Sequence, residues 1–359
     1  MCAKRLLFTG GGTAGHVIVN LALIPAFQNE GWEIDYIGSH DGIERKLVGS
    51  LNNVTYYPIS TGKLRRYLST ENIKDPFKVV KGVMQAWRII GKQKPSVIFS
   101  KGGFVSVPVI MAAKLRGVPT VIHESDFTPG LANRLSIPFA KKVLATFPET
   151  MNYLPEKKSE HVGAVVRDEL FAGDKTEGLT MCDFTSNKPV LLVMGGSGGA
   201  EKINQTVREN LDQLLTMFQI AHICGQGKTD PSFEQAGYAQ FEYVNEELQN
   251  LFAATDLVLS RAGSNAIFEF LALHKPMLLI PLSRSASRGD QIINAQSFKD
   301  QNFARVMEEE ELTDESLVNE LSQLKKQAPV IVDHMKNYRS DKSRERVMSI
   351  IKQTGGIDV

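Results

Sequence analysis

The chain has little cysteine and no long apolar run. Its three cysteines, Cys2, Cys182 and Cys224, lie far apart among 359 residues and form no Cys-x-x-Cys pair. This spacing indicates neither a disulfide framework nor a zinc site, and it favours a reducing cytoplasm. No stretch approaches the roughly 20 apolar residues of a transmembrane helix, and the apolar residues before Gly10 are too few for the core of a signal peptide. We therefore expect any contact with a membrane to be peripheral.

The charges balance overall but not along the chain. The formal net charge is +1, yet residues 1–163 hold 21 Lys and Arg against 12 Asp and Glu, and the remainder holds 20 against 28. A basic half beside an acidic half points to a polyanionic surface on one side. No nucleic-acid reader motif accompanies the basic half, so we expect no nucleic-acid partner.

Apolar runs alternate with helical patterns through both halves of the chain, as in parallel sheets covered on both faces. Two α/β domains are expected, 1–163 and 164–339, with a hinge near residues 161–167 in a polar, irregular stretch (155–186). Ligands of such an architecture bind off the carboxyl ends of the strands, in a cleft between the domains. The expected strands are Leu6–Thr9, Ile34–Ile37, Val54–Ile59, Val97–Ser100, Thr120–His123, Lys142–Thr146, Val190–Met194, Gln219–Cys224, Leu257–Ser260 and Met277–Pro281.

Two glycine-rich turns each follow a predicted strand and precede a predicted helix. The first is Gly10–Gly15, before a helix at Val17–Phe27, and the second is Gly195–Gly199, before a helix at Ile203–Leu215. Both have the form of a phosphate-binding loop, in which backbone N–H groups and a helix dipole face an anion. The first also contains the pattern Gly-x-Gly-x-x-Gly. The acidic residue that binds a nicotinamide dinucleotide at the end of the second strand is missing, however.

His16 directly follows the first glycine turn, where a helix start would direct its imidazole toward the cleft. A helix N-terminus disfavours the protonated imidazole, which keeps it able to accept a proton near pH 7. Two further loops, Ser100–Pro108 and Val121–Gly130, place glycine, hydroxyl and charged groups just past strands, and we interpret them as a binding wall. A third, Ser260–Glu269, sets a carboxylate inside a helix start and suits a ligand that carries hydroxyls and phosphate.

A basic stretch at residues 63–94 contains nine Lys and Arg and only two acidic residues. Apolar side chains recur there at helical spacing, so a helix would present an apolar stripe flanked by cations. Such a stripe is usually core, but the flanking charge favours an interface with an anionic membrane. The stripe consists of Ile73, Phe77, Val80, Met84 and Trp87, with Lys78, Lys81 and Arg88 beside it.

Taken together, the motifs resemble those of the MurG family, the membrane-associated N-acetylglucosaminyltransferases of peptidoglycan synthesis. The resemblance covers essentially the whole chain and rests on several stretches in the family's order. They are Gly10–His16, Lys101–Phe104, His123–Glu124 with Pro129–Gly130, Gly195–Gly199, Arg261–Glu269 and Asp290–Ala295.

The resemblance implies a GT-B fold, with two Rossmann-like, doubly wound parallel-sheet domains facing a cleft and a C-terminal helix (about 340–359) returning to the first domain. It implies an inverting transfer of GlcNAc from UDP-GlcNAc to the C4 hydroxyl of MurNAc in undecaprenyl-linked lipid I, which gives lipid II. The implied location is the cytoplasmic face of the cell membrane, with the basic half as acceptor and membrane domain. Other cell-wall and division proteins are possible partners.

No Asp-x-Asp sequence occurs, so we expect no metal or other cofactor and expect helix N-termini to stabilise the leaving group.

Matching positions imply roles for individual residues. His16 is the candidate base, and His123 and Glu124 are alternatives that border the same acceptor wall, which also includes Lys101, Gly102, Gly103 and Asp126. The implied donor contacts are Thr13, Ala14, Gly15, Arg167, Ser197, Val244, Ser264, Asn265, Ala266, Ile267, Phe268, Glu269, Asp290 and Gln291. Two other functions stay open at this point: a UDP-GlcNAc 2-epimerase, which shares the architecture, and a non-catalytic scaffold docked on the membrane.

Overall fold

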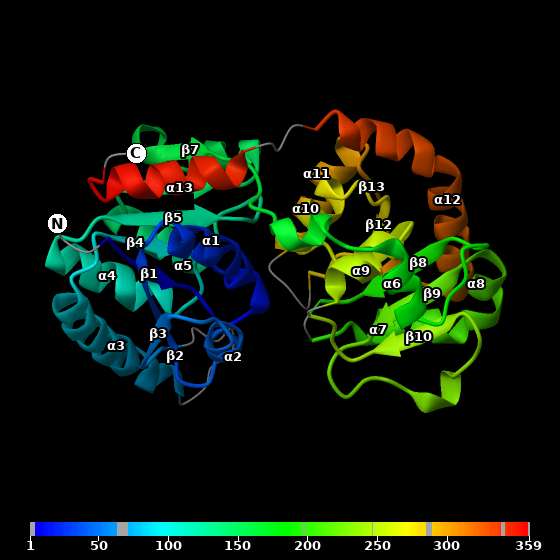
Figure 1. The fold of residues 1–359 in the computed structure, drawn as a ribbon, viewed down its shortest axis with the longest axis horizontal. Helices are drawn as coiled ribbons and strands as arrows, with labels where there is room; N and C mark the ends of the chain where they lie inside the picture. Colours follow the sequence, from blue (N-terminus) through cyan, green and yellow to red (C-terminus); the bar gives the residue numbers. More distant parts are fainter. Residues whose placement is uncertain are drawn as a thin grey trace. The chain divides into compact units, whose positions relative to one another are not determined.

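The computed structural model describes residues 4–62, 71–196, 198–245, 247–284, 289–338 and 342–357, with only the backbone at 71–74. The chain forms two compact units. Unit 1 comprises residues 1–165 and 341–359, and unit 2 comprises residues 166–340. In the described ranges each unit holds one parallel sheet flanked by helices (Figure 1), so the predicted pair of doubly wound sheets is confirmed.

Unit 1 has a seven-stranded sheet in the order β3-β2-β1-β4-β5-β6-β7 across its described residues. Its strands are β1 (Arg5–Thr9), β2 (Glu33–Ser39), β3 (Val54–Ile59), β4 (Val97–Ser100), β5 (Thr120–Glu124), β6 (Lys142–Ala145) and β7 (Ser159–His161). Its α-helices are α1 (Ile18–Asn29), α2 (Ile43–Gly49), α3 (Glu71–Gln93), α4 (Ser106–Arg116), α5 (Leu131–Ser136) and α13 (Ser343–Thr354). Short 3-10 helices are η1 (Ala14–His16), η2 (Ile137–Phe139), η3 (Pro148–Tyr153) and η4 (Glu156–Lys158).

Unit 2 has a six-stranded sheet in the order β10-β9-β8-β11-β12-β13 across its described residues. Its strands are β8 (Val190–Met194), β9 (Gln219–Ile223), β10 (Tyr238–Phe241), β11 (Leu257–Ser260), β12 (Met277–Leu279) and β13 (Ala304–Val306). Its α-helices are α6 (Lys175–Met181), α7 (Glu201–Glu209), α8 (Leu211–Met217), α9 (Leu248–Ala254), α10 (Ser264–Ala272), α11 (Asp290–Asp300) and α12 (Asp314–Lys336). Short 3-10 helices are η5 (Asp168–Phe171), η6 (Pro231–Phe233) and η7 (Glu309–Glu311).

Both faces of the sheet in unit 1 are buried, and the alternation of side chains along β1 shows how. Leu6 and Phe8 point into one apolar cluster, whereas Leu7 points into a second cluster on the other face. The Phe8 ring packs edge-on against Phe27 and Phe99, with ring centres 6.3 and 5.7 Å away. Truncating a buried ring of this kind to alanine costs about 3–5 kcal/mol.

Helix α13, at the C-terminal end of the described chain, belongs to unit 1. It contacts α1, β4 and β5, and its residues Val347 and Ile351 are fully buried in the cluster that contains Phe8 (Figure 1, red helix). Ion pairs at its surface join Arg346 to Glu160 and Lys352 to Glu30. The last helix therefore completes one face of the first sheet.

Each sheet reverses its strand order at one point. In unit 1 the reversal lies between β1 and β4, and in unit 2 it lies between β8 and β11. The loops after these strands meet at the carboxyl edge of their sheet, which is where open α/β sheets bind ligands. Both glycine turns lie at such a point.

Three strands were missed by the sequence analysis, and all three are edge strands. β7, β10 and β13 each pair on one side only, and most of their residues are partly exposed. An edge strand needs no continuous apolar run, so its sequence does not stand out. The stretch 155–186, expected to be irregular, contains the edge strand β7 and the short helix α6.

The helix expected at 203–215 is two helices, α7 and α8, which are separated by Asn210. The Asn210 amide donates to Thr206 O and to Asp314 Oδ1, both at 2.8 Å. A side chain that bonds the carbonyl four residues earlier competes with the helix ladder. The helix expected from residue 17 likewise begins one residue later, after the 3-10 turn η1.

Candidate active site

The first glycine turn is fixed from several sides. The hydroxyl of Tyr36 donates to Gly10 O at 2.8 Å, and the Asn20 amide donates to that hydroxyl at 3.0 Å. The loop after β4 crosses the turn so closely that a Cβ on Gly103, at a φ of +82°, would lie 2.1 Å from Gly11 O. Glycine is therefore required at position 103 by both backbone conformation and space.

An internal carboxylate bonds part of the first turn, which the sequence analysis interpreted as a phosphate-binding loop. Glu44 is fully buried and accepts the N–H of Gly12 at 3.0 Å and the N–H of Ser39 at 2.9 Å. The Gly12 N–H is thus already bonded to a negative group. Glu44 was missed because it lies on α2, far from the turn in sequence, and only the pairing of β1 with β2 brings it there.

His16 lies in η1 at the end of this turn, partly exposed. Its Nδ1 is 3.0 Å from Thr13 Oγ1. In the tautomer in which Nδ1–H donates to Thr13, Nε2 is the proton acceptor. Burial lowers the pKa of His16 to about 4 and nearby Lys101 adds to this, while Asp126 opposes it. The imidazole is therefore neutral at pH 7, as the sequence analysis expected.

Lys101 is buried at the point where the first two loops meet. Its N–H donates to Thr9 O at 3.0 Å, and its ammonium donates to the hydroxyl of Ser125. Burial lowers the pKa of Lys101, and the carboxylates of Glu124 and Asp126 oppose that shift. The acceptor wall inferred from the sequence thus forms one cluster at the carboxyl edge of the sheet.

Glu124 organises the loop that follows β5. Its carboxylate accepts hydrogen bonds from Asp126 N–H at 3.0 Å, Gly130 N–H at 2.9 Å and the Asn133 amide at 2.9 Å. Burial and then Asp126 raise its pKa, against Lys101 and these donors. Because its buried carboxylate accepts three hydrogen bonds, Glu124 holds this loop in place.

His123 is fully buried beside the ring of Phe99, with ring centres 6.2 Å apart. Neither of its ring nitrogens has a hydrogen-bond partner among the described residues. Burial lowers the pKa of His123 well below its usual value, and Lys101 adds to this. Of the three candidate bases, His16 alone is partly exposed.

In unit 2 the second glycine turn packs against the end of β9. A Cβ on Gly199, at a φ of +69°, would lie 2.0 Å from Cys224 O, and the Gly199 N–H donates to Gly196 O at 2.9 Å. The loops after β11 and β12, at the same edge of the sheet, start helices α10 and α11, and the first turn of a helix in general lacks intrahelical partners for its N–H groups. Ser197, a predicted donor contact, lies outside the described residues.

Two predicted donor contacts pair with each other. Glu269 on α10 accepts from Arg167, whose Nη2 and Nε lie 3.0 and 3.1 Å from Oε1. Burial raises the pKa of Glu269, whereas Arg167 lowers it. The pair lies within unit 2 although its members are far apart in sequence.

The other predicted donor residues differ in whether their side chains are accessible. Ile267 is fully buried, and the ring of Phe268 packs against that of Phe298 at 5.1 Å. Both side chains face the core, so only their backbone atoms suit a ligand. The side chains of Asn265 and Ala266 are partly exposed, whereas Ser264 and Val244 are buried.

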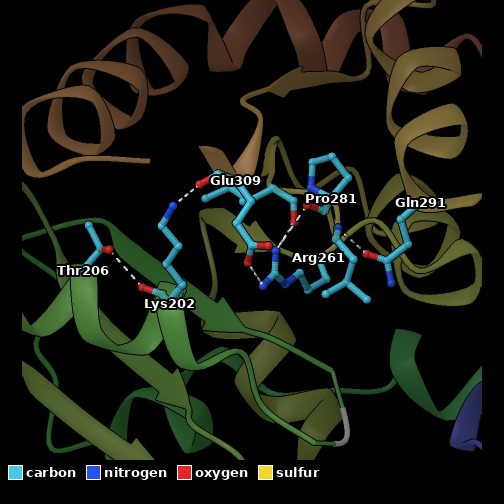
Figure 2. A network of polar contacts seen from close by, with 8 residues as sticks. Lys202, Thr206, Arg261, Pro281, Gln291 and Glu309 are labelled. Atoms are coloured by element: carbon cyan, nitrogen blue, oxygen red, sulfur yellow. Dashed lines mark hydrogen bonds and ion pairs between the residues drawn. The ribbon is translucent and has the colours of Figure 1, made fainter. Parts of the chain in front are cut away.

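A buried arginine holds the segments around the start of α11 (Figure 2). Arg261 donates to Ile280 O and Pro281 O at 3.1 and 3.2 Å and pairs with Glu309, whose backbone carbonyl accepts from Lys202. Arg261 lies in a stretch that the sequence analysis singled out, whereas its partner Glu309 did not stand out in the sequence.

Gln291 also helps to fix this region (Figure 2). Its Oε1 accepts the N–H of Leu282 at 3.1 Å, which ties α11 to the end of β12. Asp290 is the first residue of α11, and the preceding Gly289 has a φ of +86°. Both predicted donor residues therefore lie at a helix start on the carboxyl edge of the sheet.

The apolar stripe on α3 is a surface, not core. Phe77 is 76% exposed and Val80 58%, and Met84 and Trp87 are also exposed. Leu115 on α4, which the sequence analysis missed, is 70% exposed, and α4 packs against α3. The side chain of Ile73 lies outside the described part. Among the described residues, no helix has the length and apolarity to cross a membrane.

Comparisons with known proteins match both units. The model of the glycosyltransferase family 28 N-terminal domain covers residues 6–145, and that of the glycosyltransferase family 28 C-terminal domain covers residues 190–353. A UDP-N-acetylglucosamine–N-acetylmuramyl-(pentapeptide) pyrophosphoryl-undecaprenol N-acetylglucosamine transferase of Oceanobacillus iheyensis is 70% identical over 97% of this chain and 98% of its own length. Proteins of the same name from Geobacillus kaustophilus and Staphylococcus aureus are 57% and 52% identical, over 98% and 95% of this chain and 99% and 96% of their own lengths.

Solved structures share the fold at low sequence identity. MurG of Acinetobacter baumannii is similar with a TM-score of 0.75 at 23% identity, over 98% of this chain and 99% of that one. UDP-GlcNAc 2-epimerase of Neisseria meningitidis is similar with a TM-score of 0.67 at 12% identity, over 97% and 100%. These likenesses establish the GT-B fold and do not separate the two activities.

Proposed function

Since the chain belongs to glycosyltransferase family 28, and within it to the MurG family, we propose that it transfers GlcNAc from UDP-GlcNAc to the C4 hydroxyl of MurNAc in undecaprenyl-linked lipid I. The product is lipid II, the disaccharide precursor of peptidoglycan. The observation that carries this proposal is the 70% identity to a named transferase, which extends across both units.

His16 is the base that we assign to the transfer. As the C4 oxygen forms a bond to the anomeric carbon of GlcNAc, the bond from that carbon to the diphosphate breaks, and the hydroxyl proton passes to Nε2. The contact of Nδ1 with Thr13 supports this role because it orients the ring. A neutral imidazole at pH 7, as burial dictates for His16, is the form that accepts a proton.

Donor binding is assigned to unit 2. The N-termini of α10 and α11 and the second glycine turn offer backbone N–H groups to a diphosphate, and Glu269 offers Oε2 to the ribose hydroxyls while Oε1 holds Arg167. These groups stabilise the UDP leaving group through fixed dipoles. We therefore propose that the transfer needs no metal ion, in keeping with the absence of Asp-x-Asp from the sequence.

The acceptor reaches the enzyme at a membrane surface. Phe77, Val80 and Met84 on α3, with Leu115 on α4, present apolar side chains beside Lys78 and Lys81. Apolar side chains flanked by cations suit the interface of an anionic leaflet. A reducing compartment agrees with the free, buried Cys182 and Cys224, and we place the enzyme on the cytoplasmic face, as a peripheral protein.

The activity is tested by incubating the purified chain with UDP-GlcNAc and a soluble lipid I analogue. We expect equimolar UDP and a β-1,4-linked disaccharide product, and no UDP release when the acceptor is omitted. ManNAc or UDP-ManNAc formed without an acceptor would identify an epimerase instead. Donor binding without any product, in the presence of the acceptor, would favour a scaffold.

A further inference from the structure

A buried carboxylate outside the predicted site shapes the first glycine turn. Glu44 lies in the first turn of α2 and is fully buried. Its Oε2 accepts the N–H of Gly12 at 3.0 Å, and its Oε1 accepts both the N–H of Ser39 at 2.9 Å and the Ser39 hydroxyl. Glu44 thereby joins the turn after β1 to the end of β2.

Three glycines leave room for this carboxylate. A Cβ on Gly11 would lie 2.4 Å from Glu44 Cδ, one on Gly42 would lie 2.2 Å from its oxygens, and one on Gly38 would lie 2.9 Å from its Cγ. Gly11 and Gly42 have no positive φ, so space, not backbone conformation, is what a side chain would lack there. The surroundings of Glu44 are therefore fitted to its carboxylate.

Glu44 thus presents a carboxylate to an N–H group of a glycine turn, the kind of group that binds anionic ligands in phosphate-binding turns. In the described residues of the second glycine turn no carboxylate fills the equivalent place, and Gly199 instead donates to Gly196 O. The two turns thus differ: the first is bonded to a carboxylate of its own unit, and the described part of the second is not.

We propose that Glu44 is a positioning residue for the transfer. By bonding Gly12 it fixes the turn that leads through Thr13 to His16, and so sets where the imidazole meets the acceptor hydroxyl. This inference rests on the proposed function and on His16 as the base. Glu44 itself touches neither substrate.

The first test is Glu44→Gln in the full-length enzyme. The amide fits the same space, but its NH₂ group must face a donor at Gly12 or Ser39, so one of the bonds that join the turn to the end of β2 is lost. We expect kcat to fall by up to about a hundredfold, the size of effect that a displacement of about 1 Å produces. The KM for UDP-GlcNAc should change less than kcat, since most of the donor contacts that we assign lie on unit 2.

The matched control is Asp35→Asn. It removes a different buried carboxylate, which lies on β2. Asp35 pairs with Arg5 at the amino end of the strands, away from the turn, so kcat should not change. Equal losses in both variants would show that a buried charge matters only for folding, and would overturn the proposal.

Two further variants keep the test decisive if Glu44→Gln is unstable. In Glu44→Ala we expect formate, supplied at high concentration, to restore part of kcat by occupying the vacated place. Gly42→Ala keeps Glu44 but displaces its carboxylate, and should lower kcat with little change in KM. If the native enzyme transfers GlcNAc and Glu44→Gln has native kcat, the inference fails and the proposed function stands; if the native enzyme does not transfer, the proposed function fails.

Discussion

Arg167 and Glu269 form an ion pair within unit 2, with Nη2 and Nε of the guanidinium 3.0 and 3.1 Å from the same carboxylate oxygen. Both side chains are mostly buried, with 19% and 7% of their surface exposed. A pair of this kind acts as one group, because removal of either member leaves the other as an uncompensated buried charge.

The first prediction follows from this pairing. Arg167→Ala and Glu269→Gln should each weaken UDP-GlcNAc binding by about tenfold or more, and the double variant should lose less than the two single losses combined. The coupling energy should lie within about 0.5–3 kcal/mol, the range for residues in contact. Titration calorimetry on the four proteins measures it.

Arg305→Ala is the control for that cycle. Arg305 pairs with Glu320 elsewhere in unit 2, at 2.7 Å, with a similar degree of burial. Its loss should leave donor binding unchanged. Additive effects of the Arg167 and Glu269 changes would contradict the claim that the pair acts together on the donor.

The pH dependence of turnover should reflect the lowered pKa of His16. The pKa is about 4, so the imidazole stays neutral down to that pH and accepts the proton throughout the physiological range. We expect kcat/KM to be nearly flat between pH 5.5 and 7 and to fall only nearer pH 4. A decline centred on pH 6.5, with the fold intact by circular dichroism, would contradict the assignment.

Acid should destabilise unit 2 through His222. Its ring nitrogens lie 2.8 and 3.0 Å from Tyr238 OH and Asn204 Oδ1, and burial, with a smaller effect of Arg208, lowers its pKa to about 3. The unfolded chain therefore binds a proton near pH 6.5 that the folded chain does not, and the free energy of unfolding falls as pH drops from 6.5 toward 3.

The measurement is urea unfolding of the native chain and His222→Gln at several pH values from 7 to 5. The native slope should be steeper by up to about 1.4 kcal/mol per pH unit, the value for one proton, although the variant is less stable at pH 7. Identical slopes would show that His222 binds its proton equally in the folded and unfolded states, which would contradict the lowered pKa.

Membrane binding should depend on the exposed side chains of α3. Phe77→Ser combined with Met84→Ser should weaken binding to anionic vesicles by about tenfold or more, given about 1.5–3 kcal/mol per large apolar side chain. Trp87 is a poorer probe, because Arg116 stacks on its ring at 3.4 Å and bonds its carbonyl. Flotation of protein with vesicles measures the loss.

Phe171→Ser is the matched control for this surface. Phe171 is 59% exposed but lies in unit 2, so its change should not affect vesicle binding. Turnover of a soluble acceptor should be native in all these variants. Native vesicle binding by the Phe77 and Met84 variant would exclude α3 as the membrane surface.

The sequence was sufficient to predict the interior strands and the two glycine turns, because buried parallel strands carry continuous apolar runs and the turns carry glycine. It did not reveal the edge strands β7, β10 and β13, whose residues are partly exposed. It also did not reveal Glu44 or Glu309, single acids whose partners are set by strand pairing and long-range contacts. Likewise, the sequence placed Glu124 near the acceptor but could not show that three donors already bond its carboxylate.

The central claim is that His16 serves as the base of a metal-independent GlcNAc transfer. It is tested most directly by the transfer of labelled GlcNAc to a soluble lipid I analogue in the presence of EDTA, comparing the native chain with His16→Ala. We predict that the native rate survives EDTA and that the variant is slower by at least about a hundredfold, within the usual size of a general-base effect. A His16→Ala rate close to native, or native transfer abolished by EDTA and restored by a divalent cation, would contradict the account.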